Sequence, residues 1–229
     1  MQIETSNQLE DPRDKQNFVF HRTVFRRFFV GTFRLLLPIV IKVETKGFEN
    51  IPKKGPVILA SNHLTNYDVF PMQMVIERPL FFMAKSELHK NPILDFALRS
   101  LGAFPVHRGQ KDQWALRHAE KVLDHEQILA IFPEGTRSNG KGLKAGKTGA
   151  ARLSIQKNCP IVPTAITGTH LMFQNFPRRS EVSITVGEPM ILMPGESTLG
   201  MTDRLMFSIA DLLPEELRGV YSHRPKGFD

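Results

Sequence analysis

The chain of 229 residues contains the stretch PVILASNHLTNYD at residues 56–68. Its first five residues form a short apolar run of the kind that becomes a buried strand. Polar residues follow at once, and a second apolar segment, suited to a helix, begins at Val69. A strand that leads through a polar loop into a helix is the repeating unit of α/β proteins. We therefore expect His63 to lie in a loop at the carboxyl end of a strand, where such proteins tend to bind ligands.

Outward from this stretch, short apolar runs alternate with helix-like segments. The expected strands are Val57–Ala60, Leu80–Ala84, Gly102–Val106, Ile128–Phe132, Ile161–Thr167 and Val182–Val186. The expected helices are Val69–Glu77, Pro92–Leu101, Trp114–His125, Thr148–Gln156 and a late one near Met201–Leu213. This alternation predicts an α/β fold with a mixed, largely parallel central sheet flanked by helices, whose loops carry the chemistry.

Composition limits the classes of protein and of partner. With 41% hydrophobic residues, the chain can bury one sizeable core. A formal charge of +7 favours anionic partners: nucleic acid, acidic lipid or phosphorylated small molecules. The single cysteine, Cys159, excludes an internal disulfide framework, a zinc finger and an iron–sulfur cluster, and fits a reducing compartment. We interpret Cys159 as a buried structural residue, not a thiol nucleophile, because nothing near it in sequence would lower its pKa.

The first residues predict neither a secretory signal nor a membrane span. Residues 1–17 are polar and are expected to form a flexible tail. The longest apolar stretch, Phe28–Ile41, is interrupted by a glycine, a threonine, an arginine and a proline. A transmembrane helix needs ~20 consecutive apolar residues. We expect a protein that is soluble or lies on a membrane without crossing it.

Residues 18–44 form a segment of different character. Between Phe18 and Lys42 there are six phenylalanines, five Lys or Arg residues and no acid. Four apolar side chains share one face of a helix read from Val24, and two arginines lie opposite: Phe25, Phe29, Phe33 and Leu36 against Arg27 and Arg34. Opposed basic and aromatic faces are typical of a helix in a lipid interface, which predicts membrane association. The alternative is an ordinary amphipathic helix packed on the domain.

His63 and Asp68 are the first candidate pair for catalysis. On one helix, residues five apart would face ~140° apart, but a turn between them lets the carboxylate reach the imidazole. Such a pair forms a general base, because the imidazole accepts a proton while the carboxylate fixes its tautomer. The alternative is that Asp68 caps the following helix and that His63 is incidental.

Two further strand ends carry cations. Between Gly135 and Lys147, after the expected strand Ile128–Phe132, there are four glycines, four Lys or Arg residues and no acid. Glycine allows close backbone approach and arginine binds phosphate in a bidentate manner, so this loop is a candidate phosphate site. The alternative is a solvated basic loop. The second strand end is that of the expected strand Gly102–Val106, which Arg108 follows. Arg108 could face the same crevice as the basic loop, or it could lie on the surface. The chain lacks a G-x-S-x-G elbow, an H-E-x-x-H zinc helix and a Walker-type phosphate loop.

Together these blocks resemble the glycerolipid acyltransferase family typified by 1-acylglycerol-3-phosphate acyltransferases. The resemblance rests on N-H-x(4)-D at residues 62–68, GAFPVHR at 102–108, FPEGTR at 132–137 and PIVP at 160–163, and it spans roughly residues 45–190. It implies that His63 is the base and Asp68 its orienting partner. It also implies that Arg108, Glu134, Gly135 and Arg137 bind glycerol phosphate and that Pro163 shapes the acyl site. His107 and Thr164 depart from the usual family pattern.

The resemblance also implies an activity. An acyltransferase domain over residues 45–229 would move a fatty acyl group from acyl-CoA or acyl-carrier protein to the free hydroxyl of 1-acylglycerol 3-phosphate. The product would be phosphatidic acid, a precursor in phospholipid synthesis, and no metal or bound cofactor would be needed. The enzyme would lie on the cytoplasmic face of an anionic membrane.

Two other classes of function stay open. A transacylase or lipase-like hydrolase acting on phospholipid, or an acyltransferase acting on another lyso-lipid, could use the same histidine and aspartate. A non-enzymatic basic protein that binds a membrane would explain the charge and the N-terminal segment, but not the candidate residues at strand ends. Nucleic acid is not an expected partner, because the aromatic residues gather in one terminal segment and form no stacking platform.

Overall fold

The computed structural model describes residues 11–16, 18–21, 23–107, 109, 111–174 and 176–225. Within them, seven strands form one sheet in the order β1-β7-β6-β2-β5-β3-β4. The strands are β1 (Ile41–Lys46), β2 (Val57–Ser61), β3 (Leu80–Lys85), β4 (Ala103–Val106), β5 (Ile128–Ile131), β6 (Ile161–Thr167) and β7 (Ser180–Val186). Strands β6 and β7 pair antiparallel and the other neighbours pair parallel, which confirms the prediction of a mixed, largely parallel sheet.

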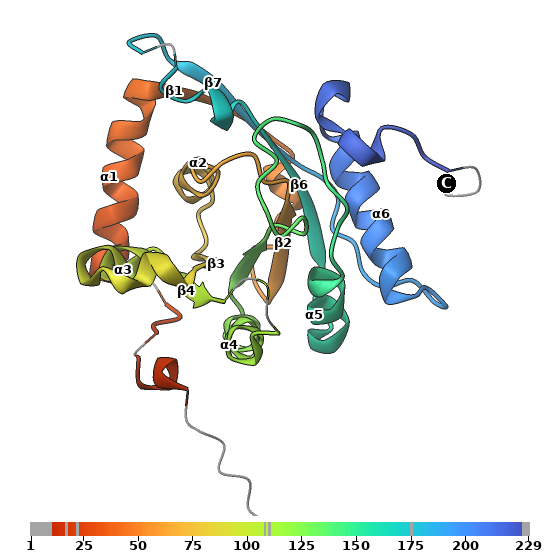
Figure 1. Ribbon diagram of the computed structural model, residues 1–229, viewed down its shortest axis with the longest axis horizontal. Helices are drawn as coiled ribbons and strands as arrows, with labels where there is room; N and C mark the ends of the chain where they lie inside the picture. Colours follow the sequence, from red (N-terminus) through yellow and green to blue (C-terminus); the bar gives the residue numbers. More distant parts are fainter. Residues whose placement is uncertain are drawn as a thin grey trace, which may run out of the picture.

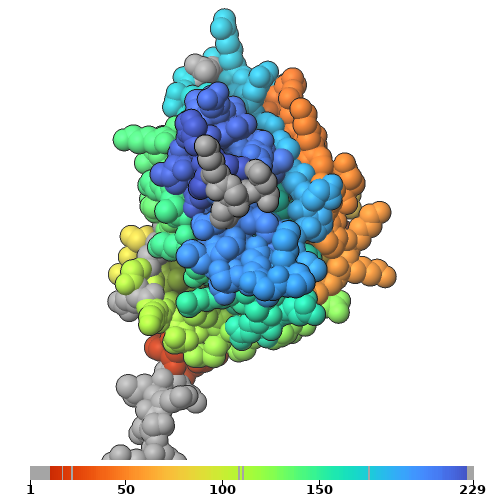
Figure 2. All heavy atoms as spheres, turned by 90° about the vertical axis from the view of Figure 1, so that its right-hand side faces the viewer, coloured from red at the N-terminus to blue at the C-terminus, as the bar shows by residue number. Residues whose placement is uncertain are grey.

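Helices cover both faces of this sheet (Figure 1). One face carries α1 (Val24–Val40), α2 (Val69–Val75) and α3 (Pro92–Ser100), and the other carries α4 (Gln113–Asp124), α5 (Gly149–Lys157) and α6 (Thr198–Asp211). Short 3₁₀ turns are η1 (Pro12–Lys15), η2 (Phe48–Asn50), η3 (Ser86–Lys90), η4 (Thr169–Leu171), η5 (Glu215–Leu217) and η6 (Gly219–Tyr221). Figure 2 views the side opposite α1, where α6 lies at the surface.

Alternation along the central strands divides the core in two. In β2, Ile58 and Ala60 pack toward α4, α5 and α6, whereas Val57 and Leu59 pack toward α1, α2 and α3. Successive side chains of a strand point to opposite faces, so a strand that is covered on both faces must be apolar throughout. The whole of β2 is buried, as the continuous apolar run at its position predicts.

The sequence predicted six of the seven strands and missed β1. Buried and exposed residues do not alternate regularly along β1, and every residue after Ile41 is exposed or partly buried. The reason is that β1 lies at the edge of the sheet, where it pairs only with β7 among the described strands. The sequence analysis assigned this stretch to the membrane-association segment over residues 18–44, whose boundary falls inside β1. An exposed edge strand carries no apolar run, so hydropathy alone does not reveal it.

The predicted tail over residues 1–17 contains an anchored piece. Arg13 forms an ion pair with Asp112, with 2.6 Å between the nitrogen and the oxygen, and stacks on the ring of Trp114. Asp14 accepts a hydrogen bond from the Trp114 indole. Residues 11–16 therefore pack against the start of α4, although their polar composition predicts no such contact.

Helix α1 presents three faces. Phe29 and Phe33 turn inward and contact Phe96 and Phe70, and Arg26 is buried with them. A second face is apolar and exposed: Val24, Phe25, Phe28, Leu35, Leu36 and Ile39. The third face bears Arg27 and Arg34, both exposed. The single aromatic face expected from the sequence is thus split between a packed side and an open side.

Candidate active site

The loop after β2 brings His63 and Asp68 together. His63 Nδ1 lies 2.7 Å from Asp68 Oδ2, and both side chains are buried. Residues 62–68 form a turn before α2, so the two side chains meet although five positions separate them. The contact that the sequence analysis proposed for a general base is present.

A dense set of donors fixes the Asp68 carboxylate. The main-chain N–H groups of Leu64 and Thr65 donate to Oδ2 at 2.8 and 3.0 Å. The hydroxyl of Thr169, at the start of η4, donates to Oδ1. Asp68 precedes α2, but its side chain makes no capping hydrogen bond to that helix. The alternative role of Asp68 as a helix cap therefore has no support in the structure.

This arrangement defines which histidine nitrogen can react. An ionised carboxylate only accepts hydrogen bonds, so the His63 Nδ1 that faces Asp68 carries the proton. The lone pair then lies on Nε2, which is the form of imidazole that acts as a base. The ring is held flat against Phe132, with centroids 4.0 Å apart and planes 15° apart. A fixed ring whose Nε2 has no hydrogen-bond partner among the described residues meets the geometric requirement for general-base catalysis.

Glu134 ties this loop to the neighbouring strand end. Its Oε1 accepts from the N–H of His63 at 2.8 Å, and its Oε2 accepts from the N–H of Lys144 at 3.0 Å. Burial raises the pKa of Glu134, and the two backbone hydrogen bonds oppose that rise in part. Because both oxygens are engaged inside the protein, the structure shows Glu134 bracing the His63 loop and the basic loop against each other.

Main-chain hydrogen bonds reinforce this junction. The N–H of Ser138 donates to the carbonyl of His63 at 2.7 Å, and the N–H of Asn139 donates to that of Leu64 at 3.1 Å. The side-chain amide of Asn62 pairs with both main-chain groups of Ile166 in β6. Strand β2 lies between β5 and β6, so the loops that follow these three strands meet at one edge of the sheet.

A cavity of about 510 Å³ opens beside His63. Its apolar wall comes from the strand ends and α4: Met83, Val106, Ala115, Leu116, Ala130, Ile131 and Phe132. Its polar lining is His63, His107, Gly109, Lys111, Asp112, Gln113, Gly135, Lys147 and Arg152. An apolar wall with a basic rim suits a ligand that joins a hydrocarbon chain to an anionic group.

The acidic group on this rim, Asp112, stays ionised, and its ion pair with Arg13 offsets its negative charge. Burial alone would raise the pKa of Asp112, but hydrogen bonds from Arg13 and from the N–H groups of His107 and Ala115 lower that pKa to about 2. By contrast, Lys111, Lys147 and Arg152 are exposed. The rim therefore presents net positive charge to a ligand.

The remaining predicted residues divide into three groups. Gly135 lines the cavity at φ +68°, a left-handed backbone conformation that favours glycine, and Lys147 Nζ lies 2.8 Å from the position that a Cβ would take. Arg137 is exposed and does not belong to the cavity lining, and Pro163 is buried within β6, away from that lining. Arg108 lies outside the described residues, although its neighbours His107 and Gly109 line the cavity.

Sequence reasoning missed several residues of the site. The sequence predicts Phe132 only as the end of a strand and part of a block, and it gives no role to Thr169, although Phe132 contacts His63 and Thr169 contacts Asp68. Lys111 and Arg152 also went unnoticed because they lie in segments with no motif of their own. Cys159 is buried, and burial raises the pKa of its thiol to about 11, as expected of a structural cysteine.

Comparison with known proteins follows the same blocks. The family model described as Acyltransferase matches residues 42–167. The chain is similar to two proteins named 1-acyl-sn-glycerol-3-phosphate acyltransferase. The one from Borreliella burgdorferi is 30% identical over 135 residues, which are 58% of this chain and 54% of that protein. The one from Bacillus subtilis is 27% identical over 165 residues, or 72% and 81%.

A human relative and a solved structure agree with these two matches. The human protein named 1-acyl-sn-glycerol-3-phosphate acyltransferase alpha is 26% identical over 185 residues, and the match covers 79% of this chain and 64% of the human one. The crystal structure of the 1-acyl-sn-glycerophosphate acyltransferase PlsC from Thermotoga maritima superposes with a TM-score of 0.59 at 25% identity, covering 72% of this chain and 70% of that one. Because the family model matches more than half of the chain and includes the His63–Asp68 loop and the FPEGTR block, this protein belongs to the Acyltransferase family.

Proposed function

We propose that this protein transfers an acyl group from a thioester to the free hydroxyl of 1-acylglycerol 3-phosphate, giving phosphatidic acid. His63 Nε2 takes the hydroxyl proton as the oxygen attacks the thioester carbonyl. The carbon–sulfur bond then breaks, and the thiolate leaves with the proton that the imidazolium returns. No bond to the protein forms in this sequence of steps.

The observation that carries the proposal is the position of His63. Its imidazole is held by Asp68 at one end of a cavity that has an apolar wall and a basic rim. A lysophospholipid and an acyl thioester both combine a hydrocarbon chain with an anionic group. The names of the relatives support the choice of acceptor, since each is a 1-acyl-sn-glycerol-3-phosphate acyltransferase.

We further propose that the acceptor phosphate contacts the basic loop after β5. The Arg137 side chain has no hydrogen bond or ion pair among the described residues, so its guanidinium is available to a ligand. Gly135 would allow close approach of the phosphate, with Lys147 beside it. In this proposal Arg108 adds a second guanidinium, Glu134 holds the loop in place, and Pro163 shapes the acyl side through its strand.

The donor and the location belong to the proposal as well. Either acyl-CoA or acyl-carrier protein would supply the thioester, without a bound cofactor or metal. No helix among the described residues is long and apolar enough to cross a membrane. The exposed apolar residues of α1 continue onto α3 through Ile93, Leu94 and Phe96, a surface suited to peripheral contact with a bilayer. We propose the cytoplasmic face of an anionic membrane.

A thiol-release assay over a panel of acceptors tests the function. With acyl-CoA or acyl-carrier protein as donor, 1-acylglycerol 3-phosphate should give the fastest release, and phosphatidic acid should be the lipid product. An equal rate without any acceptor would identify a thioester hydrolase instead. Acyl transfer between two lipids with no thioester present would identify a transacylase. Addition of a chelator should leave the rate unchanged.

A further inference from the structure

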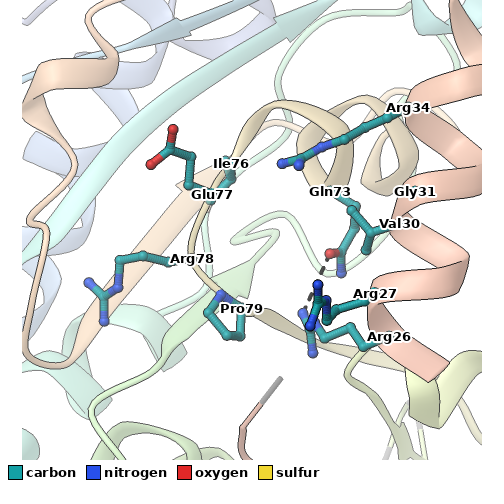
Figure 3. Close-up of a pocket in the computed structure, with 10 residues that line it drawn as sticks. All are labelled: Arg26, Arg27, Val30, Gly31, Arg34, Gln73, Ile76, Glu77, Arg78 and Pro79. Atoms are coloured by element: carbon teal, nitrogen blue, oxygen red, sulfur yellow. Dashed lines mark hydrogen bonds between the residues drawn. The ribbon is translucent and has the colours of Figure 1, made fainter. Parts of the chain in front are cut away.

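A second pocket, of about 290 Å³, lies between α1, the end of α2 and the start of β3 (Figure 3). Residues of α1 form one wall, and Gln73, Ile76, Glu77, Arg78 and Pro79 form the other. β3 begins just after Pro79, so the pocket lies at the amino-terminal edge of the parallel strands. His63 follows the carboxyl end of β2, which places the active-site cavity at the opposite edge.

Four arginines line this pocket, and two of them are fixed by the protein itself. Arg26 is buried and donates to the carbonyl of Leu80 at 2.6 Å. Arg78 donates to the carbonyls of Pro52, Gly55 and Glu126 at 2.5–2.6 Å. Neutral carbonyls do not cancel the charge of a guanidinium. Arg26 and Arg78 therefore add fixed positive charge to the lining of the pocket.

The other two arginines keep donors for a ligand. Arg34 uses its Nε to donate to the carbonyl of Met74 at 2.9 Å, and this bond directs the guanidinium over the pocket. The structure records no hydrogen bond for its two terminal nitrogens, and none for the Arg27 side chain, within the described part of the chain. A planar guanidinium with two free N–H groups matches the oxygens of a phosphate group.

Gly31 leaves the wall between these arginines open. It lies inside α1, four residues after Arg27 and three before Arg34, which places all three on adjacent turns of the helix. A glycine in a helix interior costs roughly 1 kcal/mol relative to alanine. No atom lies within 4 Å of the Cβ that a larger residue would add, so packing does not require a glycine. Because Gly31 itself lines the pocket, its lack of a side chain leaves this part of the wall open.

We propose that this pocket binds a phosphate group, most suitably the head group of an anionic phospholipid, at a site separate from the reacting acceptor. The exposed apolar face of α1 lies on the same helix as Arg27 and Arg34, which brings the pocket to the proposed membrane surface. The site would hold the enzyme at lipids that carry phosphate, including its own product. This proposal goes beyond acyl transfer and does not depend on the chemistry at His63.

Glu77 provides a test in the opposite direction. It is the acidic residue among the pocket's described lining, it is exposed, and it makes no ion pair within the described residues. A carboxylate on the rim repels a bound phosphate. Glu77→Gln should therefore tighten binding several-fold, whereas replacement of the arginines should weaken it.

The experiment measures sedimentation of the full chain with vesicles of phosphatidylcholine that contain phosphatidic acid. Arg27→Gln combined with Arg34→Gln should lower the association constant by roughly tenfold or more. Arg27→Lys with Arg34→Lys keeps the charge but loses bidentate contact, and should also lose several-fold. Gly31→Leu adds apolar surface yet should weaken binding, because its side chain would extend from the pocket wall that Gly31 leaves open. The matched control, Arg117→Gln with Lys121→Gln on α4, removes two charges from the opposite face and should change little.

Two further arms distinguish the source of the phosphate. If inorganic phosphate competes with the vesicles for the unmodified protein but not for the double glutamine variant, the pocket accepts free phosphate as well as a head group. If the unmodified protein binds phosphatidic acid vesicles more tightly than the double glutamine variant does, and inorganic phosphate does not compete, the ligand is the lipid. Equal binding by the unmodified and double glutamine proteins, or full binding by the double lysine variant, would overturn the site. Thiol release from water-soluble substrates, measured in parallel, reports separately on acyl transfer.

Discussion

At the residue scale, the least replaceable atom of the site is His63 Nε2. His63→Ala removes the proposed base, and a positioned base contributes typically ~10²–10⁴-fold to a rate. We expect kcat for thiol release to fall by about this factor. The thermal unfolding transition of the variant serves as the check on its fold, since the ring stacks on Phe132 and its loss leaves a gap. A folded His63→Ala protein that keeps most of the activity would rule out the base assignment.

Substitutions of Asp68 and Thr169 should reduce kcat less than loss of His63 does. Asp68→Asn should cost less than loss of His63 but still orders of magnitude, because the amide no longer fixes the tautomer of the imidazole. Thr169→Val removes one donor to Oδ1 and leaves the His63 contact to Oδ2 in place, so we expect a loss nearer tenfold. The measurement is kcat with saturating substrates. A larger loss in Thr169→Val than in Asp68→Asn would contradict this order.

Arg137 tests the proposed phosphate contact. Bidentate recognition is specific to arginine, so Arg137→Lys should raise KM for 1-acylglycerol 3-phosphate by about tenfold and leave KM for the thioester nearly unchanged. Lys141→Gln serves as the control, because Lys141 is an exposed cation of the same loop outside the cavity lining. With an acceptor that lacks the phosphate, the variant and the unmodified protein should have almost the same activity. Equal losses with both acceptors would mean that Arg137 only stabilises the loop.

The contact between His63 and Asp68 could be predicted from the sequence, whereas the contacts that hold their loop could not. His63 and Asp68 follow a recognisable strand within five positions of each other, so local pattern was enough to pair them. Glu134 was expected to touch the substrate, whereas both of its oxygens accept main-chain hydrogen bonds from His63 and Lys144. That contact depends on β2 and β5 being neighbours in the sheet. Strand order is a property of tertiary structure and is not encoded in a local motif.

At the element scale, α4 buries a titratable group in an aromatic cluster. The ring of His118 lies among Phe18, Phe20, Phe104 and Trp114. Burial, with a smaller effect of Lys121, lowers the pKa of His118 to about 4. The unfolded chain binds a proton at an ordinary histidine pKa of about 6.5, so stability is present above that pH and is lost as pH falls toward the folded pKa.

We expect His118→Gln to reduce the acid sensitivity of the fold. Between pH 7 and pH 4.5 the unmodified protein should lose roughly 2 kcal/mol of unfolding free energy through this group, and the variant should lose correspondingly less. Urea unfolding at the two pH values measures the difference. His223→Gln, at an exposed histidine near the C-terminus, is the control. The same pH dependence in His118→Gln as in the unmodified protein would show that His118 does not govern it.

Helix ends and strand ends were predicted with different success. β6 matches its predicted bounds at Ile161–Thr167, because it is apolar throughout and flanked by Pro160 and Gly168. Helix α6 begins three residues before the predicted start, at a Ser197 cap whose hydroxyl accepts from the N–H of Gly200. The predicted start at Met201 leaves out the first turn, residues 198–200, because the Ser197 cap was not recognised in the sequence.

At the scale of the whole molecule, the two sheet faces have different surroundings. The side that carries α1 and α3 exposes a group of large apolar residues, many of them on α1, whereas α6 covers the other side (Figures 1 and 2). Tyr67 and Phe173, in contact with each other near the His63 loop, are also exposed. Apolar residues that gather on one side and extend toward the His63 loop agree with the proposal that this protein takes its substrate from a bilayer.

This arrangement predicts a component of membrane binding that salt does not remove. Val24, Phe28 and Leu35 are 79%, 65% and 74% exposed, and burying such side chains in lipid is worth about 1.5 kcal/mol or more each. Replacing all three by glutamine should lower vesicle association roughly tenfold per residue, equally at low and high salt. Leu199→Gln with Val220→Gln, at 60% and 66% exposed positions on the α6 side, should leave association unchanged. The arginine pocket differs in that its contribution should fade as salt rises. If the triple variant sediments with vesicles as well as the control does, the apolar face of α1 does not bind lipid.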